Sequence, residues 1–313
     1  MPARRLALTI LAVFVAFTAF FSLAVSDRVP DYLRAHESDD PLLPEDPPMR
    51  RRDVYELKLR LRDLGFFDGD MDEEYDAEAV LAVKEFQSSF WLAPTGIVDQ
   101  ATWRALGYGV TRDVSVATGP LPEGVVHLEV DTDRLELTVY VDSKPWKTYP
   151  VAGGKWSALT PVGEWKIVDK GYEQGGAFGS RWMGLDVPWG GYGIHGTNRP
   201  WSIGTYASVG CIRMFNEDVE ELYEIVEIGT RVVIRGPRPY LTLEAPLGKG
   251  AIGPEVVMLQ ECLKAAGFDP GACDGRLGTL TESQIEEASW LFGLGDSRVA
   301  TADLYTLLGM KGR

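Results

Sequence analysis

The strongest constraint in this sequence is a pattern that occurs twice, on either side of a central stretch with a different periodicity. An apolar helical stripe that begins at Val54 returns 202 positions later at Val256. The loop after the first stripe, LGFFDGDMD, has a counterpart, AGFDPGACDG, after the second. A repeat that flanks another segment indicates a chain of several small units. The 313 residues are long enough for about two or three domains.

The first repeat, from Asp53 to Gly107, has the pattern of three short amphipathic helices. Asp76 and Asp99 stand where the N-caps of the second and third helices are expected. The apolar residues of the three predicted faces are Val54, Leu57, Leu61 and Leu64, then Ala79, Val83, Phe86 and Phe90, then Trp103 and Leu106. We therefore expect a small helical module here.

The central stretch, residues 125–236, changes from helical to alternating periodicity. The runs 126–130 and 135–141 flank an Asp-Thr-Asp-Arg turn and predict a β-hairpin. One helix is expected after Asn216, which we predict to be its N-cap because acidic residues follow it. Its buried stripe is predicted to be Val219, Leu222, Tyr223 and Val226. The centre is therefore predicted to be mainly β with one prominent helix.

The N-terminus carries a hydrophobic segment, residues 6–25, without any charge. Its length matches the roughly 20 residues that a helix needs to span a bilayer. Arg4 and Arg5 predict a cytoplasmic N-terminus, with everything after residue 27 outside. Ala24-Val25-Ser26 resembles a cleavage site, so a cleaved signal peptide is the alternative to an uncleaved anchor.

The composition excludes one class of partner and leaves one question about cysteines open. With 46 acidic and 31 basic residues the net charge is −15, which argues against nucleic acid, because binding a polyanion requires a basic face. Outside the cytoplasm, Cys262 and Cys273 are close enough in sequence for a local disulfide. Whether this bond forms stays open; if it does, Cys211 is the odd thiol.

The densest group of unusual residues runs from Gly190 to Asn216. Its recurring glycines indicate sharp turns or close approach to a ligand. Cys211 and His195 lie in it, sixteen positions apart, and a cysteine nucleophile needs a nearby imidazole as base. Zinc is the rival interpretation, but one cysteine and one histidine without a CxxC or HxxxH partner supply too few ligands. We predict neither a metal nor a cofactor.

A longer motif surrounds this pair. It consists of Ile194-His195-Gly196-Thr197, Pro200, Ser202-Ile203-Gly204 and Ser208-Val209-Gly210-Cys211-Ile212-Arg213-Met214, followed by Asn216 and Asp218. Residues 160–165 and 178–182 agree with the same pattern. Over residues 125–236 the chain resembles the catalytic domain of the L,D-transpeptidase family. One departure is Val209, where many members have a histidine.

The resemblance implies a two-step acyl transfer on peptidoglycan stem tetrapeptides. It implies Cys211 as nucleophile, His195 as base, the carbonyl of Gly196 as the group that orients the imidazole, and backbone N–H groups around Gly210 and Cys211 as oxyanion hole. The implied substrate-binding residues are Arg213 for a carboxylate, Ser208, Thr197 and Tyr192. A structural ion pair is the alternative role of Arg213.

Both repeats resemble peptidoglycan-binding modules. The first matches through Phe86-Gln87, Thr95-Gly96 and Thr102-Trp103, whereas the second lacks the Phe-Gln pair and is degenerate. The expected organisation is a signal anchor or signal peptide at 1–27, a linker at 28–50, the first module at 51–109, a linker at 110–124, the catalytic domain at 125–236, a linker at 237–246 and the second module at 247–311.

The expected function is therefore that of an extracytoplasmic L,D-transpeptidase in cell wall biogenesis. The implied partners are peptidoglycan stem peptides and glycan, the cytoplasmic membrane through the N-terminal helix, and carbapenem β-lactams as covalent inhibitors. The same residues acting with water as acceptor give an L,D-carboxypeptidase or endopeptidase. A non-catalytic wall-binding scaffold is the third alternative.

Overall fold

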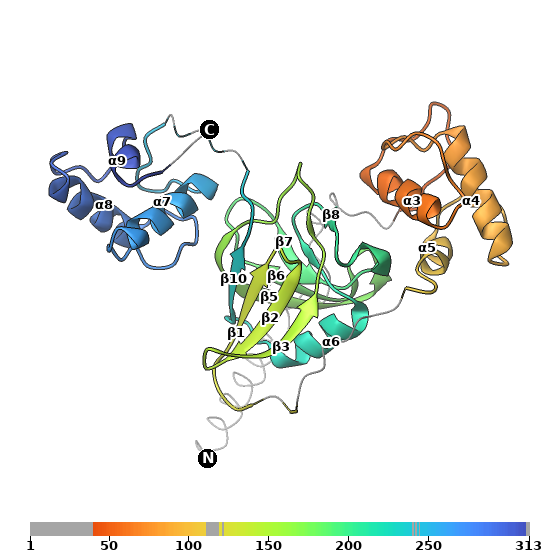
Figure 1. Cartoon of the computed structure of the whole chain (residues 1–313), viewed down its shortest axis with the longest axis horizontal. Helices are drawn as coiled ribbons and strands as arrows, with labels where there is room; N and C mark the ends of the chain where they lie inside the picture. Colours follow the sequence, from red (N-terminus) through yellow and green to blue (C-terminus); the bar gives the residue numbers. More distant parts are fainter. Residues whose placement is uncertain are drawn as a thin grey trace, which may run out of the picture.

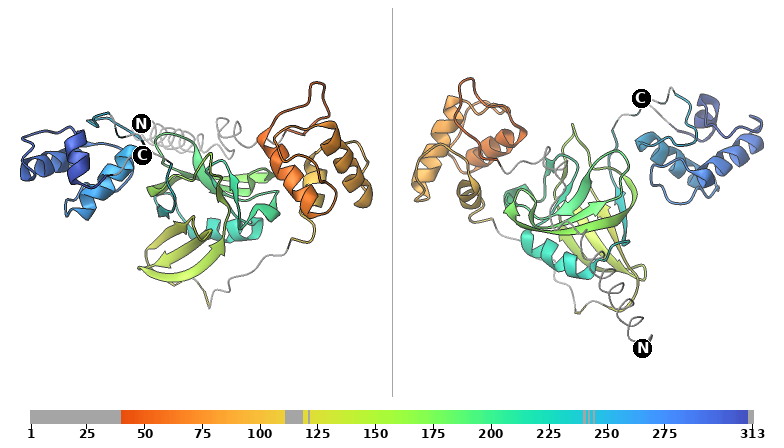
Figure 2. Two further views of the ribbon diagram at one scale, coloured as in Figure 1. Left: turned by 45° about the horizontal axis from the view of Figure 1, so that its top comes forward. Right: turned by 180° about the vertical axis from the view of Figure 1, so that it is seen from behind.

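The computed structural model describes residues 40–110, 119–120, 122–239, 241, 243 and 245–310. Two helical modules lie on either side of a mainly-β domain (Figure 1 and Figure 2). Within these ranges no helix combines the length and the hydropathy needed to cross a membrane. The hydrophobic segment expected as an anchor or signal peptide, in residues 1–27, lies outside the described residues.

The N-terminal module consists of α3 (Arg52–Asp63), α4 (Ala77–Ser89) and α5 (Gln100–Leu106). Both predicted caps are confirmed, since Asp76 accepts a hydrogen bond from the N–H of Ala79 at 2.8 Å and Asp99 accepts one from Thr102 at 2.9 Å. The predicted faces form one hydrophobic cluster, which includes Val54, Leu57, Leu61, Ala79, Val83, Phe86, Trp103 and Leu106.

Part of the expected linker at 28–50 belongs to this module instead. Leu42 is fully buried in the module's core and exchanges backbone hydrogen bonds with Val98, at 3.2 and 3.0 Å. Arg50 forms an isolated bridge with Glu74. The sequence did not predict that these residues belong to the module, because the segment is rich in proline. A single buried leucine and two backbone bridges also produce no apolar periodicity.

The central domain is built on a mixed sheet. Its strands are β1 (Val126–Asp131), β2 (Glu136–Val141), β3 (Lys144–Pro150), β5 (Gly163–Gly176), β6 (Gly179–Leu185), β7 (Tyr192–His195), β9 (Ile212–Arg213) and β10 (Arg231–Arg235). Their order in the described part of the chain is β3-β2-β1-β10-β5-β6-β7-β9. The predicted hairpin is confirmed, because β1 and β2 pair antiparallel, with Val126 opposite Val141. A small second sheet joins β4 (Gly153–Gly154) to β8 (Tyr206–Ser208).

The predicted helix of the central domain is α6 (Asn216–Ile225), which packs against β6 and β7. Its predicted stripe, from Val219 to Val226, is buried. The predicted role of Asn216 as N-cap is wrong, since Phe215 occupies that position without a side-chain cap. The Asn216 amide instead accepts hydrogen bonds from the N–H groups of Ser180 and Thr197, both at 3.1 Å, because the loop after β7 passes directly over the helix start.

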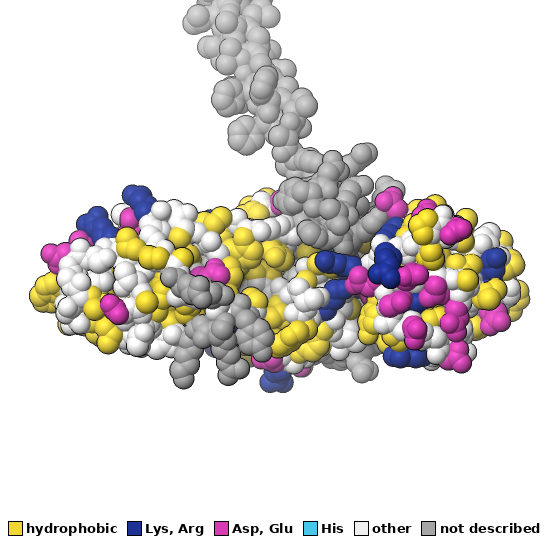
Figure 3. Space-filling model, turned by 90° about the horizontal axis from the view of Figure 1, so that it is seen from above, with side chains coloured by type: hydrophobic (Ala, Val, Ile, Leu, Met, Phe, Trp, Pro, Cys, Tyr) yellow, Lys and Arg dark blue, Asp and Glu magenta, His cyan; other side chains and the backbone are white. Residues whose placement is uncertain are grey.

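The C-terminal module repeats the helical pattern with α7 (Pro254–Ala265), α8 (Thr279–Leu291) and α9 (Ala302–Leu307). It has a hydrophobic cluster of its own, but Val257 and Cys273 belong to the cluster of the central domain. The expected linker at 237–246 is also held in place, since Tyr305 donates a hydrogen bond to the carbonyl of Ala245 at 2.9 Å. Figure 3 shows this elongated molecule from above, with side chains of both charges on the N-terminal module at the right.

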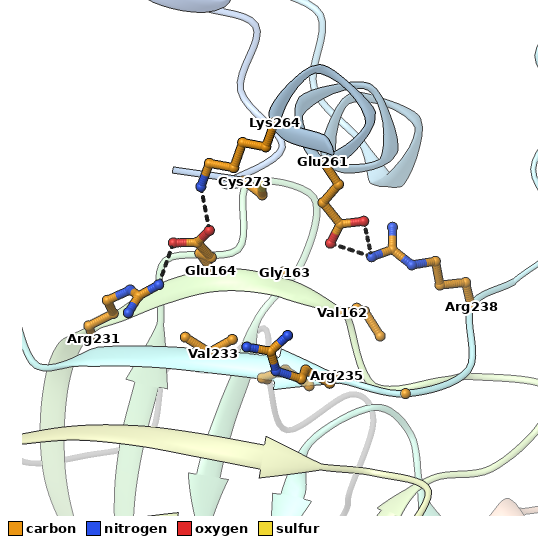
Figure 4. Close-up of a pocket in the computed structure, with 12 residues that line it drawn as sticks. Val162, Gly163, Glu164, Arg231, Val233, Arg235, Arg238, Glu261, Lys264 and Cys273 are labelled. Atoms are coloured by element: carbon orange, nitrogen blue, oxygen red, sulfur yellow. Dashed lines mark hydrogen bonds and ion pairs between the residues drawn. The ribbon is translucent and has the colours of Figure 1, made fainter. Parts of the chain in front are cut away.

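Ion pairs fasten the C-terminal module to the sheet (Figure 4). Glu164 of β5 accepts hydrogen bonds from Lys264 of α7 at 2.7 Å and from Arg231 of β10 at 2.8 Å, and its N–H donates to the carbonyl of Cys273 at 2.9 Å. Arg238 pairs with Glu261. Cys211, Cys262 and Cys273 are all free thiols, so the structure contains no Cys262–Cys273 bond.

Candidate active site

Two neighbouring strands bring His195 and Cys211 to one place. β7 and β9 pair in parallel, with His195 opposite Arg213. Side chains of paired residues lie on the same face, and faces alternate along a strand. Cys211 directly precedes β9, two residues before Arg213, and alternation therefore places it on the face of His195. The sixteen positions between them in sequence form the loop that connects the two strands.

The imidazole of His195 is completely buried and fixed on several sides. Its Nδ1 lies 2.6 Å from the carbonyl oxygen of Gly196. Trp182 of β6 stacks on the ring, with centroids 5.7 Å apart and planes 26° apart, and Phe178 contacts its edge at 5.0 Å. Trp182 is itself held by a hydrogen bond from its Nε1 to Asp169, at 2.7 Å. A carbonyl at Nδ1 favours the tautomer with the proton there, which makes Nε2 the basic nitrogen.

Cys211 lies beside the same aromatic side chains as His195. Its side chain is half-buried and packs against Phe178 and Trp182, the two residues that also contact His195. It opens onto a cavity of about 420 Å³. The cavity is lined by Arg52, Ser157, Ala158, Phe178, Trp189, Gly190, Gly191, Tyr192, Val209 and Cys211. The thiol is thus open to a group bound in this cavity, whose lining does not include the buried His195.

A tight turn fixes the backbone of the thiol. Ser208 donates a hydrogen bond to the carbonyl of Cys211 at 2.5 Å and accepts one from the N–H of Gly210 at 3.1 Å. Gly210 has a φ of +111°, and a Cβ there would lie 2.6 Å from the ring of Tyr192, so only glycine fits. The Gly210 N–H, one of the donors expected for the oxyanion hole, is used inside the turn in this structure.

Tyr192 borders the cavity beside the thiol. Burial raises the pKa of its hydroxyl, and negative charge on Cys211 raises it further, while a hydrogen bond with Trp189 lowers it. Tyr192 is therefore a neutral hydrogen-bonding group near the Cys211 thiol at physiological pH. Thr197, in contrast, is buried and accepts a hydrogen bond from the N–H of Arg199 at 3.0 Å. Its hydroxyl thus helps to shape the loop after β7.

Arg213 forms a buried ion pair with the N-terminal module. It is 1% exposed and binds Glu56 of α3 through both guanidinium nitrogens, at 3.1 and 3.2 Å. Arg199 binds the same carboxylate at 3.0 Å. The carboxylate that Arg213 holds in this structure is thus that of the N-terminal module, as the alternative role of a structural ion pair anticipated. Glu56 and Arg199 carried no signal for this contact, because each reads locally as an ordinary polar residue.

Burial and charge compete at Glu56. Burial alone would raise the pKa of its carboxyl, but Arg213 and Arg199 together lower the pKa below its usual value. The group is therefore ionised at neutral pH and neutralises part of the charge of two buried guanidinium groups. Nothing in the described residues forms a cluster of histidine, cysteine or carboxylate groups suited to a metal ion.

A second cavity, of about 460 Å³, lies at the junction with the C-terminal module (Figure 4). It is lined by Glu164, Arg231, Arg238, Glu261 and Lys264 among others, and contains Cys273. Burial raises the pKa of the Cys273 thiol to about 12, while Lys264 lowers it in part. This thiol is protonated at neutral pH and has no imidazole in the cavity lining, so the second cavity lacks the means for thiolate chemistry.

Comparison with known proteins assigns the family. Residues 125–234 match the model of the L,D-transpeptidase catalytic domain, and residues 50–106 and 252–308 match that of a peptidoglycan binding domain. YkuD of Bacillus subtilis, named as an L,D-transpeptidase, is 43% identical over 133 residues, which are 42% of this chain and 80% of the relative. YqjB of the same organism is 40% identical over 130 residues, 37% of this chain and 73% of the relative. The chain belongs to the L,D-transpeptidase family.

Solved structures include members of the same family. The catalytic domain of an E. faecium L,D-transpeptidase has 26% identity and a TM-score of 0.31, covering 37% of this chain and 100% of that one. An L,D-transpeptidase from Xylanimonas cellulosilytica has 24% identity and a TM-score of 0.30, covering 59% of this chain and 94% of that one. The family assignment rests on the sequence matches.

Proposed function

We propose that this protein is a peptidoglycan L,D-transpeptidase that forms cross-links or attachments through a thioester on Cys211. The observation that carries the proposal is that His195 of β7 and Cys211, the residue before the adjacent strand β9, pack against the same two aromatic side chains. The contact between His195 Nδ1 and the carbonyl of Gly196 supports the imidazole as a base at Nε2.

The proposed reaction is an acyl transfer in two steps. The Cys211 thiol gives its proton to His195, and the sulfur attacks the carbonyl carbon that joins the third residue of a stem tetrapeptide to its terminal D-alanine. His195 returns the proton to the departing D-alanine nitrogen as the C–N bond breaks, leaving a thioester. An acceptor amine then attacks the thioester, loses a proton to His195, and the thiol is regenerated.

Other groups of the chain are proposed to stabilise the oxyanion, contact the peptide and hold the enzyme on the wall. The N–H of Cys211 is the proposed main-chain donor to the developing oxyanion, since Gly210 N–H serves Ser208. Tyr192, neutral and bordering the cavity, is the proposed side-chain contact for the peptide. Ser208 holds the turn that presents the thiol and takes no proton in the reaction. The two peptidoglycan-binding modules are proposed to hold the enzyme on the wall outside the cytoplasm.

The decisive experiment is mass analysis of products after incubation with a purified disaccharide-tetrapeptide. A cross-linked dimer supports transpeptidation, a tripeptide product without dimer supports hydrolysis by a carboxypeptidase, and an unchanged substrate contradicts both. Cys211→Ala should abolish every product, whereas Cys262→Ala, which changes a cysteine far from the cavity, should leave the product pattern unchanged.

The nature of the nucleophile is tested separately with a carbapenem. We expect intact-protein mass spectrometry to show one covalent adduct on the wild type and on Cys262→Ala, and none on Cys211→Ala. Cys211→Ser should lose nearly all turnover, because a hydroxyl is far harder to ionise than a thiol beside the same imidazole. An adduct that persists in Cys211→Ala contradicts the assignment.

A further inference from the structure

The N-terminal module is docked on the active-site domain by buried charges. Glu56 of α3 lies between Arg199 and Arg213, with three nitrogen–oxygen contacts of 3.0 to 3.2 Å. Both guanidinium groups are almost fully buried, at 3% and 1% exposure. Asp53 adds a contact to Arg199 at 3.4 Å. Charges this well buried and paired define one orientation of the helix on the domain.

Aromatic contacts fix the same orientation. Trp201, which belongs to the loop between β7 and β9, packs against the hydrophobic cluster of the N-terminal module. Its ring stacks on Trp103 of α5, with centroids 6.0 Å apart and planes 18° apart. The guanidinium of Arg60 lies 5.6 Å from the Trp201 ring, and that of Arg199 lies 4.5 Å from the Trp103 ring. The module and the catalytic loop are thus packed as one unit.

This docking brings a cation to the nucleophile. Arg52 precedes Glu56 by four residues in α3, so both side chains lie on the same face of the helix. Arg52 lines the cavity of Cys211 together with Ser157 and Tyr192. Its side chain is exposed and makes no hydrogen bond or ion pair with any of the described residues. A guanidinium without a partner beside a reactive thiol is suited to a carboxylate that arrives with the substrate.

We propose that Arg52 is a substrate-binding residue, supplied to the active site by the N-terminal module, which binds the free C-terminal carboxylate of the peptide donor. This inference rests on the proposed function. In the peptide bond that Cys211 attacks, the leaving residue carries its carboxylate on the carbon next to the scissile nitrogen. A donor with a free C-terminus therefore brings an anion into the same cavity as the thiol, where Arg52 selects it. The module then acts in specificity as well as in wall binding.

A pair of alkylating reagents tests the position of the charge without any turnover. Iodoacetate and iodoacetamide have nearly the same size, but only iodoacetate is anionic. We expect Arg52→Gln to lower the rate ratio of iodoacetate to iodoacetamide at Cys211 by about three- to tenfold, as for loss of one charge at short range in a partly hydrated cleft. Peptide mass spectrometry measures the alkylation of Cys211 separately from that of the other cysteines. Arg62→Gln, an exposed arginine of the same helix outside the cavity, should leave the ratio unchanged.

Substrate kinetics test the carboxylate itself. Arg52→Gln should raise KM for a tetrapeptide with a free C-terminus by about ten- to a hundredfold, the range of a charge-assisted hydrogen bond, with a much smaller change for the C-terminal amide. Arg52→Lys should recover part of the affinity. Glu56→Gln, which loosens the docking, should reproduce the loss seen with Arg52→Gln although it leaves Arg52 in place.

The outcomes separate the two proposals. If wild-type protein turns over no peptide but the alkylation ratio falls in Arg52→Gln and not in Arg62→Gln, the proposed function fails while the placement of the cation stands. Arg52 does not bind the carboxylate if Arg52→Gln and Arg62→Gln give the same alkylation ratio. The same conclusion follows if Arg52→Gln raises KM equally for the free acid and for the C-terminal amide. Either result overturns the inference.

Discussion

Replacing Glu56 by glutamine removes the charge at the centre of the interface between the N-terminal module and the catalytic domain. The substitution keeps the size of the side chain but removes the negative charge that faces the guanidinium of Arg213, which is 1% exposed. Breaking a buried pair by removing one partner costs about 3 to 5 kcal/mol, since the other charge stays desolvated. Arg199 still has Asp53 at 3.4 Å, which reduces the loss on that side.

The domain can relieve most of this penalty by releasing the module, because water then reaches both arginines. The free energy of docking is therefore an upper limit on what the substitution can cost. At about 1.4 kcal/mol for each factor of ten, even 3 kcal/mol raises the undocked fraction about a hundredfold. We expect opening of the interface rather than unfolding of the catalytic domain.

Hydrogen exchange followed by mass spectrometry measures this opening directly. Glu56→Gln should speed exchange in peptides covering α3 and the loop around Arg199, while the sheet strands stay protected. Glu73→Gln is the matched control, because Glu73 pairs with Lys155 across the same interface at 3.6 Å and both side chains are partly exposed. Such a pair is worth about 0 to 1 kcal/mol. Equal exchange in the two variants would refute the view that Glu56 holds the interface.

Three further predictions concern pH, packing and thiol reactivity. Docking lowers the pKa of Glu56 from its ordinary value of about 4.5, so the carboxylate stabilises the docked state fully above that pH and loses this effect as the pH falls through the lower pKa of the docked state. The protection factors of α3 amides, which correct for the pH dependence of intrinsic exchange, should therefore be constant from pH 7 to 5 and fall at lower pH. Gly193→Ala should destabilise the catalytic domain by about 1 to 3 kcal/mol in thermal unfolding, since its Cβ would lie 2.4 Å from Trp182, whereas Gly278→Ala, with open space around it, should not. Cys273, whose pKa is raised to about 12 by burial, should resist a maleimide at pH 8 under conditions that label Cys211.

Local sequence patterns predicted the helical modules well. Each helix of the first module has an apolar stripe, and two of them have an aspartate cap that the structure uses, at Asp76 and Asp99. Such features depend on residues three or four positions apart, so a single sequence contains them completely. The error at Asn216 has the same origin, because its side chain is used by Ser180 and Thr197, which local spacing cannot reveal.

The order of the strands could not be predicted in the same way. Periodicity predicts the hairpin of β1 and β2, but β1 also pairs in parallel with β10, with His127 opposite Arg231. Nothing local distinguishes that neighbour from any other apolar strand. The placement of His195 beside Cys211 depends on the parallel pairing of β7 and β9, and the sequence indicated it only through the family motif.

The interface between the N-terminal module and the catalytic domain could not be predicted from the sequence, for a similar reason. Glu56 and its partners Arg199 and Arg213 are separated by 143 and 157 positions. A glutamate within an amphipathic helix is normally solvated, and an arginine after a nucleophile is easily taken for a substrate ligand. Only the three-dimensional arrangement shows that the carboxylate of Glu56 lies between the two guanidinium groups and offsets part of their charge.

The internal repeat offers a comparison within the chain itself. The positions of Arg52 and Glu56 correspond, 202 residues later, to Pro254 and Met258, which carry neither charge. The C-terminal module therefore cannot make the contact that docks the N-terminal one, and it uses a different part of the same helix, with Lys264 bound to Glu164. Two copies of one helical pattern thus join the catalytic domain through different faces. Of the two copies, the one with the Arg-Glu pair contributes to the lining of the Cys211 cavity, which is where we propose that an added cation affects the choice of substrate.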